Sequence, residues 1–552
     1  MKKRKIKKES FMQGVLVLMI SQIMIKILGL VYRLYLTNRE GFGDKGNAIY
    51  GSGFQIYALL LTISSVGVPN AVSKLVSERV AIGDHKGAYR IFKIAFITFG
   101  AIGFISSSIL FLGADYIANQ LLQIPEAELT LVALSPSIFF VTISCVIKGY
   151  FNGRENLKVT AHSQTLEQIL KTVLSVILVE LVGIVSGVDT AMMAAGANLA
   201  TTLATALCFG YLFRYYQQAK TEIAWEIKHS TNHQITRVRK TIINILSVSI
   251  PMSLGAILGT INKNIDSMTV VRGLKKFLSE EEAKIEYGIL TGKVETLVTL
   301  PMSFNMAFAT ALVPAISSSQ ARGDVATSEK RISFSLLITI LIGLPCSIGM
   351  ILYAEPILQL LFPNATAGAF IYQISSIGII FIVLEQTISG ALHGMGKMIT
   401  PAIALGIGVI VKLILNLALI PISPNDFILG GTAGAAFATV VCHGIAVMIE
   451  FCILKRNIAL KLDLSKFVIK PILATGLMGI VSYLVYQNLL NITSKKIVTV
   501  LAIFVAIITY AIFLIVLKIF SKEEIFMIPF GKKIYNFLKR LRLYGKRRKL
   551  LK

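Results

Sequence analysis

The chain has 552 residues, of which 55% are hydrophobic and only 15% charged, and its formal net charge is +26 at pH 7. A soluble globular domain carries about a quarter charged residues, so this composition excludes an ordinary soluble protein and indicates a membrane protein. The basic residues are spread over short segments between apolar stretches, which membrane topology and attraction to anionic lipid explain better than nucleic-acid binding.

Stretches of about 20 apolar residues, long enough to cross a hydrocarbon core of about 30 Å, follow one another along the chain. The first six are predicted at residues 10–33, 48–70, 91–113, 128–149, 160–183 and 190–213. Six more are predicted at 241–262, 287–313, 333–353, 369–391, 400–421 and 431–454, and a final two at 467–488 and 496–519. The sequence therefore predicts an all-α integral membrane protein with 14 transmembrane helices.

The two sets of six spans repeat one another at an offset of about 240 residues. The stretch from Ile27 to Arg33 aligns with that from Ile257 to Lys263. Further along, Gly149, Gly153, Ala161 and Lys171 fall opposite Gly390, Gly394, Ala402 and Lys412. Because each repeat holds an even number of spans, both enter the membrane with the same orientation, and we expect two parallel lobes related by an axis along the membrane normal.

The repeats define the predicted domains. These are an N-lobe at 1–213, a cytoplasmic connector at 214–240, a C-lobe at 241–455, two further helices at 456–519 and a basic amphipathic tail at 520–552. Most lysine and arginine residues fall on the side of the N-terminus, so the positive-inside rule predicts that both termini are cytoplasmic. Two such lobes enclose a cleft that rocking opens to one side and then to the other, which is alternating access.

Ionisable side chains in or near the spans are costly in a bilayer unless they face protein or water, so they are candidate functional residues. The predicted cationic lining of the cleft is Lys26, Arg33, Lys74, Lys171, Lys263, Lys293 and Lys412. The predicted coupling or charge partners are Glu167, Glu295 and Glu385. For Lys171 the structural alternative is an ion pair with Glu167, one turn away. Its pairing with Lys412 in the repeat predicts a shared environment.

Glycine and proline interrupt several spans, and in lipid the backbone groups that they free must find other partners. The hinge candidates are Gly67, Pro69, Pro301 and Pro314. The structural alternative is a set of tolerated kinks. No nucleotide-binding, catalytic or metal-ligand motif stands out, so we predict no enzyme, no metal and no cofactor.

An excess of cations suits an anionic substrate such as a diphosphate, with arginine as a forked donor and lysine as a point charge. Without a nucleotide site, the energy for transport is expected from a Na⁺ or H⁺ gradient or from the membrane potential. A potential of 100 mV supplies about 2.3 kcal/mol per charge moved.

The segments Lys26–Arg33, Gly67–Glu78, Tyr287–Gly292 and Leu312–Ser317 resemble the multidrug/oligosaccharidyl-lipid/polysaccharide exporter superfamily. Within it, they resemble the MurJ-type and stage V sporulation protein B-like branch. The likeness extends over nearly the whole chain, including the layout of two repeats and two extra helices. Lys26 stands at the family's first cavity arginine, but Tyr32-Arg33 replaces the Arg-Asp that often ends this motif.

This resemblance implies a flippase in the bacterial plasma membrane. It would move undecaprenyl-diphosphate-linked cell-wall precursors, lipid II above all, from the cytoplasmic to the outer leaflet. The implied partners are the lipid-linked anionic glycan, membrane lipids and cell-wall synthases. The lipid tail would follow a groove beside the last two helices.

Three alternatives remain open from the sequence. The first is a translocase for another lipid-linked polysaccharide repeat unit, or a sporulation-specific paralogue, because these substrates share the diphosphate head. The second is a cation-coupled multidrug exporter, in which acids such as Glu167 or Glu385 would dominate the cleft. The third is a non-transporting membrane scaffold for cell-wall synthases, in which the cleft cations would be dispensable.

Overall fold

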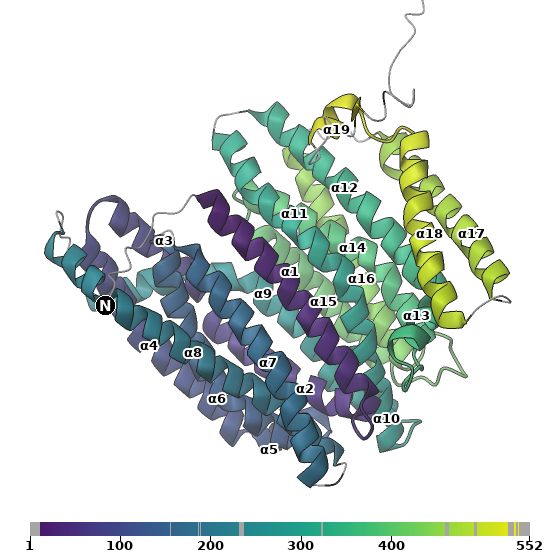
Figure 1. Ribbon diagram of the computed structural model, residues 1–552, viewed down its shortest axis with the longest axis horizontal. Coiled ribbons are helices and arrows are strands. Elements are labelled where there is room, and N and C mark those ends of the chain that lie inside the picture. Colours follow the sequence, from purple (N-terminus) through teal and green to yellow (C-terminus); the bar gives the residue numbers. More distant parts are fainter. Residues whose placement is uncertain are drawn as a thin grey trace, which may run out of the picture. The chain divides into compact units, whose positions relative to one another are not determined.

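The computed structural model describes residues 11–154, 156–185, 187, 189–230, 237–321, 324–458, 463–490, 494–527, 535–536 and 539. The regular elements in these residues are all helical (Figure 1). By length and composition, 11 of the described helices could each cross a membrane, or up to 12 if one bent pair counts as a single span. The chain is therefore a multi-pass membrane protein.

The helices of the first part of the chain coincide with the first six predicted spans. They are α1 (Phe11–Asn38), α2 (Gly43–Ser65), α3 (Val68–Ala81), α4 (His85–Leu112), α5 (Ala114–Tyr116), η1 (Ile117–Leu122), η2 (Pro125–Ala127), α6 (Glu128–Asn152), α7 (Leu157–Val185) and α8 (Thr190–Lys228). Because α8 continues to Lys228, the first half of the predicted connector at 214–240 is helical.

The remaining elements match the other predicted spans. They are α9 (Val238–Leu274), α10 (Glu280–Gly288), η3 (Ile289–Val294), α11 (Glu295–Ala321), α12 (Val325–Leu352), α13 (Ala354–Leu361), α14 (Ala369–Gly394), α15 (Ile399–Leu419), α16 (Thr432–Asn457), η4 (Ser465–Ile469), α17 (Lys470–Leu489), α18 (Lys495–Val516) and α19 (Lys522–Met527). The total of fourteen spans and the cytoplasmic termini stay predictions. Most of the predicted tail lies outside the described residues.

Helix α9 is longer than the sequence predicts. It has 37 residues and runs to Leu274, whereas the predicted span ends at residue 262. It bends by 52° between Val238–Ile250 and Ser253–Leu274, and Pro251 lies in the break, as expected for a residue that removes a helical hydrogen bond. Asp266, which lies beyond the predicted end of this span, is consequently buried within a helix.

The chain divides into two compact units. Unit 1 comprises Met1–Ser303, Phe362–Ile371 and Met398–Ala446, and unit 2 comprises Phe304–Leu361, Tyr372–Lys397 and Val447–Lys552. Three of the five divisions fall inside helices, in α11 just after Pro301, in α14 and in α16, and the other two fall between helices. These units differ from the predicted lobes at 1–213 and 241–455, which follow the sequence repeat. The lobes therefore stay a prediction.

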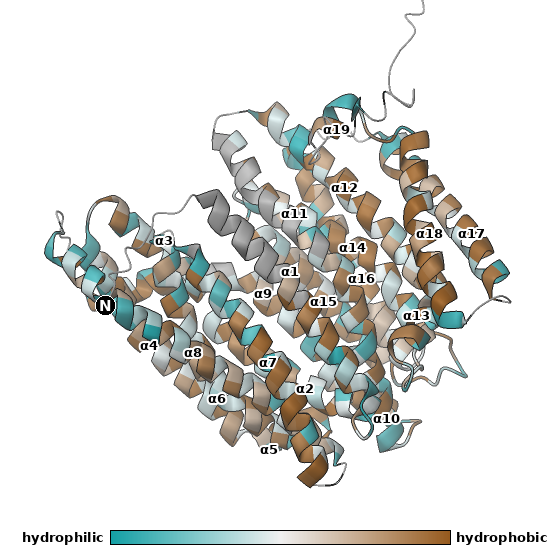
Figure 2. Cartoon of the chain, in the orientation of Figure 1, coloured by the Kyte–Doolittle hydropathy of each residue, from teal (hydrophilic) through white to brown (hydrophobic). Residues whose placement is uncertain are grey.

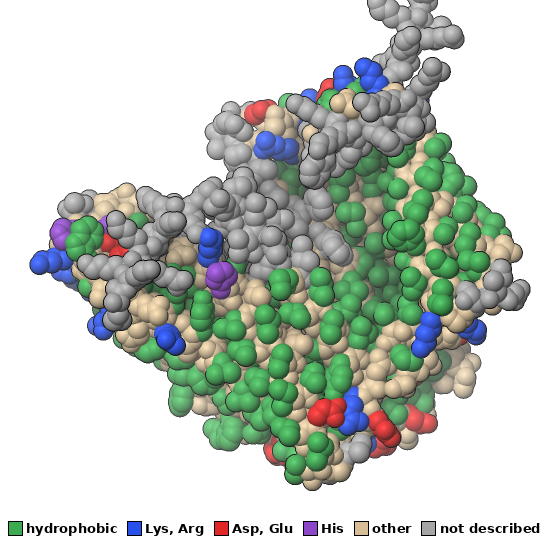
Figure 3. All heavy atoms as spheres, in the orientation of Figure 1, with side chains coloured by type: hydrophobic (Ala, Val, Ile, Leu, Met, Phe, Trp, Pro, Cys, Tyr) green, Lys and Arg blue, Asp and Glu red, His purple; other side chains and the backbone are tan. Residues whose placement is uncertain are grey.

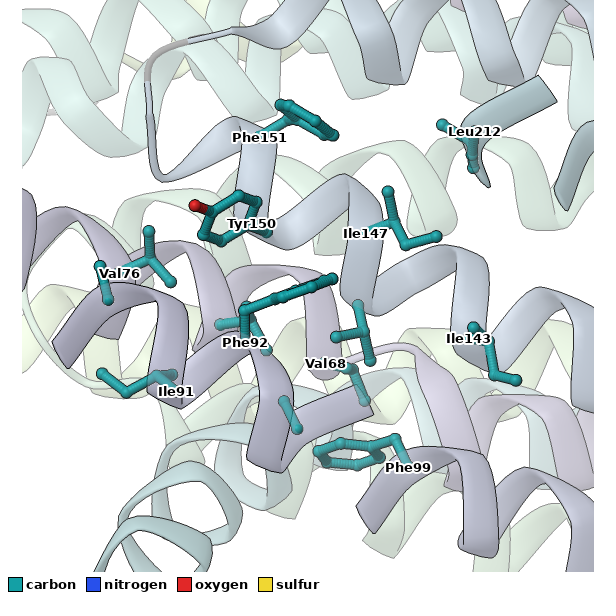
Figure 4. Close-up of a cluster of buried hydrophobic side chains, with 14 of the residues drawn as sticks. Val68, Val76, Ile91, Phe92, Phe99, Ile143, Ile147, Tyr150, Phe151 and Leu212 are labelled. Carbon is teal, nitrogen blue, oxygen red and sulfur yellow. The ribbon is translucent and has the colours of Figure 1, made fainter. Parts of the chain in front are cut away.

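The largest described core of unit 1 lies among α3, α4, α6 and α8. Figure 4 shows its side chains converging from these helices. The ring centroids of Phe92 on α4 and Tyr150 on α6 are 4.7 Å apart, and Leu212 on α8 is fully buried in the same cluster. Such packing holds helices together in lipid, where apolar surface alone gives no preference for protein over hydrocarbon.

Unit 2 has its own core, built from α12, α14, α16, α17 and α18. Tyr510 on α18 is buried in it and donates a hydrogen bond of 2.9 Å to the carbonyl of Leu341 on α12. The outer faces of α17 and α18 are strongly hydrophobic (Figure 2), and Figure 3 shows hydrophobic side chains gathered over these helices. Phe504 and Ile507 of α18 are exposed. An exposed apolar surface of this extent is typical of a protein surrounded by lipid.

Equivalent positions of the two repeats make equivalent contacts. Asp84 caps α4 by accepting a hydrogen bond from the backbone nitrogen of Gly87, and Asp324 caps α12 in the same way through Thr327. The hydroxyls of Ser107 and Ser347 each donate a 2.7 Å bond to a carbonyl, that of Ser135 and that of Ser376 respectively. A duplicated six-helix unit predicts this recurrence.

Candidate functional site

Three helices of unit 1 bring two cations and three aromatic rings together. Tyr32 and Arg33 lie on α1, Tyr50 and Phe54 on α2, and Lys171 on α7. We call these five residues the aromatic–cationic site. Tyr50 and Phe54 lie one turn apart on α2, so their rings share one face and stack with centroids 5.9 Å apart.

The guanidinium of Arg33 lies over a ring. Its Cζ is 4.8 Å from the centroid of Tyr50, and its Nη1 donates a 3.2 Å hydrogen bond to Oδ1 of Asn47. Asn47 in turn donates to Thr37, and the hydroxyls of Tyr32 and Tyr50 are 2.7 Å apart. Neutral groups therefore hold Arg33, and most of its donors have no partner among the described residues.

The ammonium of Lys171 also lies over rings, 4.5 Å from the centroid of Phe54 and 5.7 Å from that of Tyr32. Within the described part of the chain, no carboxylate is at ion-pair distance from Lys171 or Arg33. The alternative pairing of Lys171 with Glu167 is not found, because Glu167 lies 3.6 Å from Lys148 instead. The site thus holds two half-buried positive charges without a described countercharge.

Lys412, the repeat partner of Lys171, lies in a different environment. It is 1% exposed, and its ammonium donates to Asp266 at 2.6 Å and to the carbonyl of Asn262 at 2.8 Å. Asn416 donates to the other oxygen of Asp266. The expectation of a shared environment was therefore wrong, because α9 supplies a carboxylate where α1 supplies none.

Lys293 is also neutralised inside the protein. It is 0% exposed and donates three hydrogen bonds, to Asp44 at 2.9 Å and to the carbonyls of Ala365 and Ala367 at 2.8 Å each. Close packing of α2 on α10 permits this geometry, because any side chain at Gly288 would collide with the Asp44 carbonyl. All three donors of this ammonium are in use.

The other predicted charges do not join the aromatic–cationic site in the described structure. Lys263 is exposed and lies 3.7 Å from Glu295, and Lys74 is exposed on α3. Glu385 belongs to unit 2. The side chain of Lys26 lies outside the described residues. Substrate binding by the predicted cations stays a prediction for each of them.

The hinge candidates lie at helix junctions and within α11. Gly67 precedes α3 and packs so closely on α9 that a side chain there would collide with the Ser249 carbonyl, and Pro69 lies in the first turn of α3. Pro301 is buried in α11, whereas the side chain of Pro314 lies outside the described residues. Motion about these positions stays a prediction.

Sequence reasoning missed the partners that decide the state of each cation. Asp44 precedes the predicted span at 48–70 and Asp266 follows the one at 241–262, so neither was among the candidate residues. The spacing of four residues between Tyr50 and Phe54 predicts that their rings share one helix face. Many other apolar residues of the same span have this spacing, so it does not distinguish these two.

Apart from the aromatic–cationic site, a cleft of about 640 Å³ opens at the junction of α1 and α2. Its described cations are already paired, Arg39 with Glu180 at 2.8 Å and Lys45 with Glu281 at 2.7 Å. The hydrogen bond from Lys45 lowers the pKa of the Glu281 carboxyl from its usual value. This cleft suits an anionic substrate less well than the aromatic–cationic site does.

Comparisons with known proteins agree with this architecture. The polysaccharide biosynthesis protein family matches residues 11–320, and the lipid II flippase MurJ family matches residues 294–528. The chain is 25% identical over 527 residues to stage V sporulation protein B of Bacillus subtilis (strain 168), covering 95% of this chain and 98% of that protein. It is 24% identical over 485 residues to the lipid II flippase MurJ of the same organism, covering 85% and 87%.

A solved structure of the lipid II flippase MurJ in an inward closed conformation shares the fold. Its TM-score is 0.67 at 17% identity, and the match covers 90% of this chain and 98% of that one. Where these relatives have a named activity, it is lipid flipping and not enzymatic catalysis. The chain belongs to the polysaccharide biosynthesis protein family, and it is similar to the lipid II flippase MurJ family and to stage V sporulation protein B.

Proposed function

We propose that the chain flips a lipid-linked precursor with an anionic diphosphate head from the cytoplasmic to the outer leaflet, and that lipid II is its substrate. This proposal rests on Arg33 and Lys171. Both side chains are half-buried, and neither has a carboxylate partner at ion-pair distance among the described residues. A diphosphate cannot cross hydrocarbon unaided, because burying its charge without partners costs many kcal/mol. Two uncompensated cations on a membrane helix pair offer those partners.

The energies favour binding of an anion at this site. A contact between a cation and an aromatic ring contributes about 0.5–2 kcal/mol, whereas a hydrogen bond to a charged group contributes about 1.5–3 kcal/mol. Lys171 has three ammonium donors, and its described contacts are ring faces. A diphosphate oxygen can therefore replace a ring contact with a stronger one, while Arg33 offers the forked geometry that suits phosphate.

In an alternating-access cycle, the ion pair between Lys293 and Asp44 would help to hold the transport path closed at one surface of the membrane. It joins α2 of the first repeat to η3 of the second and to the segment Phe362–Ile371, all within unit 1. The predicted topology places this junction at the outer surface. Release of substrate to the outer leaflet would then require Lys293 to leave its three acceptors, and the Na⁺ or H⁺ gradient or membrane potential would supply the energy.

A sporulation-specific substrate is the second candidate. The observation in its favour is the likeness to stage V sporulation protein B, which covers 95% of this chain, against 85% for MurJ. The substrate in that case would still be a lipid-linked glycan, and the same cations would bind it. A multidrug exporter for cations fits less well, because the aromatic–cationic site concentrates positive charge.

The direct test is flipping of fluorescent lipid II in proteoliposomes that contain the purified chain. We expect flipping by the wild type and a loss of about 10- to 100-fold in Lys171→Met, from the loss of one charged hydrogen bond. Lys220→Met is the matched control, because Lys220 is exposed on α8 and its loss should leave flipping unchanged. A wild type that does not flip lipid II would refute this substrate.

Complementation separates the remaining alternatives. Rescue of a conditional lipid II flippase mutant supports lipid II, whereas rescue only of a strain lacking stage V sporulation protein B supports the second candidate. A scaffold that recruits cell-wall synthases would retain its function in Arg33→Ala and Lys171→Met. Loss of rescue in these folded variants would exclude the scaffold.

A further inference from the structure

Unit 2 contains a buried carboxyl group that takes no part in the proposed binding of substrate by Arg33 and Lys171. Glu450 on α16 is 0% exposed. Ser389 on α14 donates a 2.8 Å hydrogen bond to its Oε1, and its Oε2 has no hydrogen-bond partner among the described residues. No Lys or Arg of the described chain lies at ion-pair distance from it.

The described groups that act on Glu450 lie on α14, and residues 446–449 and 451–454 of its own helix are apolar. Leu454 lies one turn further along α16, and it belongs to the buried cluster to which α12, α17 and α18 contribute. On α14, Glu385 and His393 lie one turn before and one turn after Ser389, so all three share one face. Glu385 acts electrostatically on Glu450 and has the same charge sign when ionised.

A charged carboxylate in such a place is costly. Burial of an unpaired charge costs many kcal/mol, and one hydroxyl donor with a second carboxyl group nearby does not offset this. A metal cation would need about six oxygen ligands, and the described residues contain no group of three or more His, Cys, Asp or Glu side chains that could hold one. A bound proton removes the charge and needs no further ligand.

We infer that Glu450 is a proton-binding site of unit 2, held by Ser389 and influenced by Glu385, and that it carries its proton in this conformation. The site requires only that α14 and α16 remain packed. When the helices separate enough to admit water, the carboxyl can release the proton. A role of this proton in driving flipping rests on the proposed function, whereas proton binding itself does not.

Chemical labelling tests the site without any transport. Dicyclohexylcarbodiimide reacts with protonated carboxyl groups in apolar surroundings: the acid proton moves to a reagent nitrogen and the carboxyl oxygen bonds to the central carbon. Rearrangement to an N-acylurea then leaves the whole reagent on the side chain. In the purified full-length chain, mass spectrometry should find the adduct at Glu450, at a yield that falls as the pH rises.

Controls make the labelling decisive. Glu450→Gln should lose the adduct and still fold, because the amide has the shape of the protonated acid, and Glu385→Gln should keep it. Absence of an adduct at Glu450 throughout an acidic-to-alkaline series would overturn the inference. So would protection by NaCl but not by choline chloride at constant pH, which would identify a metal cation. The wild-type result stands even if a variant fails to fold.

Transport measurements then test coupling. In proteoliposomes that flip fluorescent lipid II, an imposed proton gradient should change the wild-type rate several-fold and leave Glu450→Gln unaffected. An equal response of both would overturn the coupling role. If the wild type does not flip lipid II at all, the proposed function fails while the labelling result still decides the proton site.

Discussion

Lys171 and Lys412 occupy the same position in the two repeats, yet their charges are treated differently. Alignment of Arg33 with Lys263 places Leu36 of α1 opposite Asp266 of α9. Lys412 is buried against Asp266, whereas Lys171 lies over aromatic rings and Leu36 is fully buried without offering a charge. The two environments therefore differ by one carboxylate: Asp266 neutralises Lys412, whereas Lys171 has no described carboxylate partner.

The energies of the two environments differ accordingly. Removing one partner of a buried ion pair typically costs about 3–5 kcal/mol, because the other charge stays buried and unpaired. A half-buried cation over a ring contributes about 0.5–2 kcal/mol and can exchange that contact for a stronger one. The second repeat thus uses its lysine to join α9 to α15, whereas the lysine of the first repeat has no described countercharge.

The largest effect is expected from Asp266→Leu, which copies the residue of the first repeat into the second. Lys412 would remain buried without its carboxylate, so the free energy of unfolding should fall by about 3–5 kcal/mol. Thermal unfolding of the purified protein measures this loss. The double variant Asp266→Leu with Lys412→Met should recover most of it, and a single variant as stable as the wild type would contradict the assignment.

The reciprocal exchange is Leu36→Asp, which places a carboxylate at the position that corresponds to Asp266, the partner of Lys412. We expect the new aspartate to pair with Lys171 and to lower the rate of lipid II flipping by about 10- to 100-fold, the equivalent of about 1.5–3 kcal/mol of charged hydrogen bonding. Leu36→Asn is the matched control, since it buries a polar group without a charge. Equal flipping rates in the two variants would show that charge compensation is irrelevant.

A third comparison concerns packing that both repeats share. A Cβ at Gly149 would lie 2.8 Å from the Pro69 carbonyl, and one at Gly390 would lie 2.8 Å from the Ala309 carbonyl. Each alanine variant should therefore lose about 1–3 kcal/mol of stability, by similar amounts. Gly210→Ala is the control because nothing lies within 4 Å of that position. Very unequal losses would argue against structural equivalence of the repeats.

The smallest effect is expected from Arg33→Lys, which keeps the charge but loses the forked donors and the broad contact with Tyr50. A cost of about 0.5–1 kcal/mol corresponds to a decrease of about 2- to 5-fold in flipping. Arg33→Gln, which removes the charge, should decrease flipping further. Equal rates for the two variants in the proteoliposome assay would show that the charge of Arg33 does not bind substrate.

The sequence by itself determined the membrane helices, the repeat and the set of charged residues worth testing. Apolar length and glycine positions are local properties, so the predicted spans coincide with described helices, and Gly149 and Gly390 make matching contacts. Where a local property misled, the helices α8 and α9 continued beyond their predicted ends. α9 continues past its predicted end at residue 262, and Asp266 is therefore buried within a helix.

Only the tertiary structure decided which of those charges are compensated. Lys293 meets Asp44, and Glu167 meets Lys148 rather than its neighbour on α7, because the packing of separate helices brings these residues together. An ion pair depends on a distance of a few ångströms between groups that are far apart in the chain, and periodicity along one helix does not encode that distance. The packing of α1, α2 and α7 places Lys171 over aromatic rings, with no described carboxylate at ion-pair distance. The sequence of α7 alone does not contain this information.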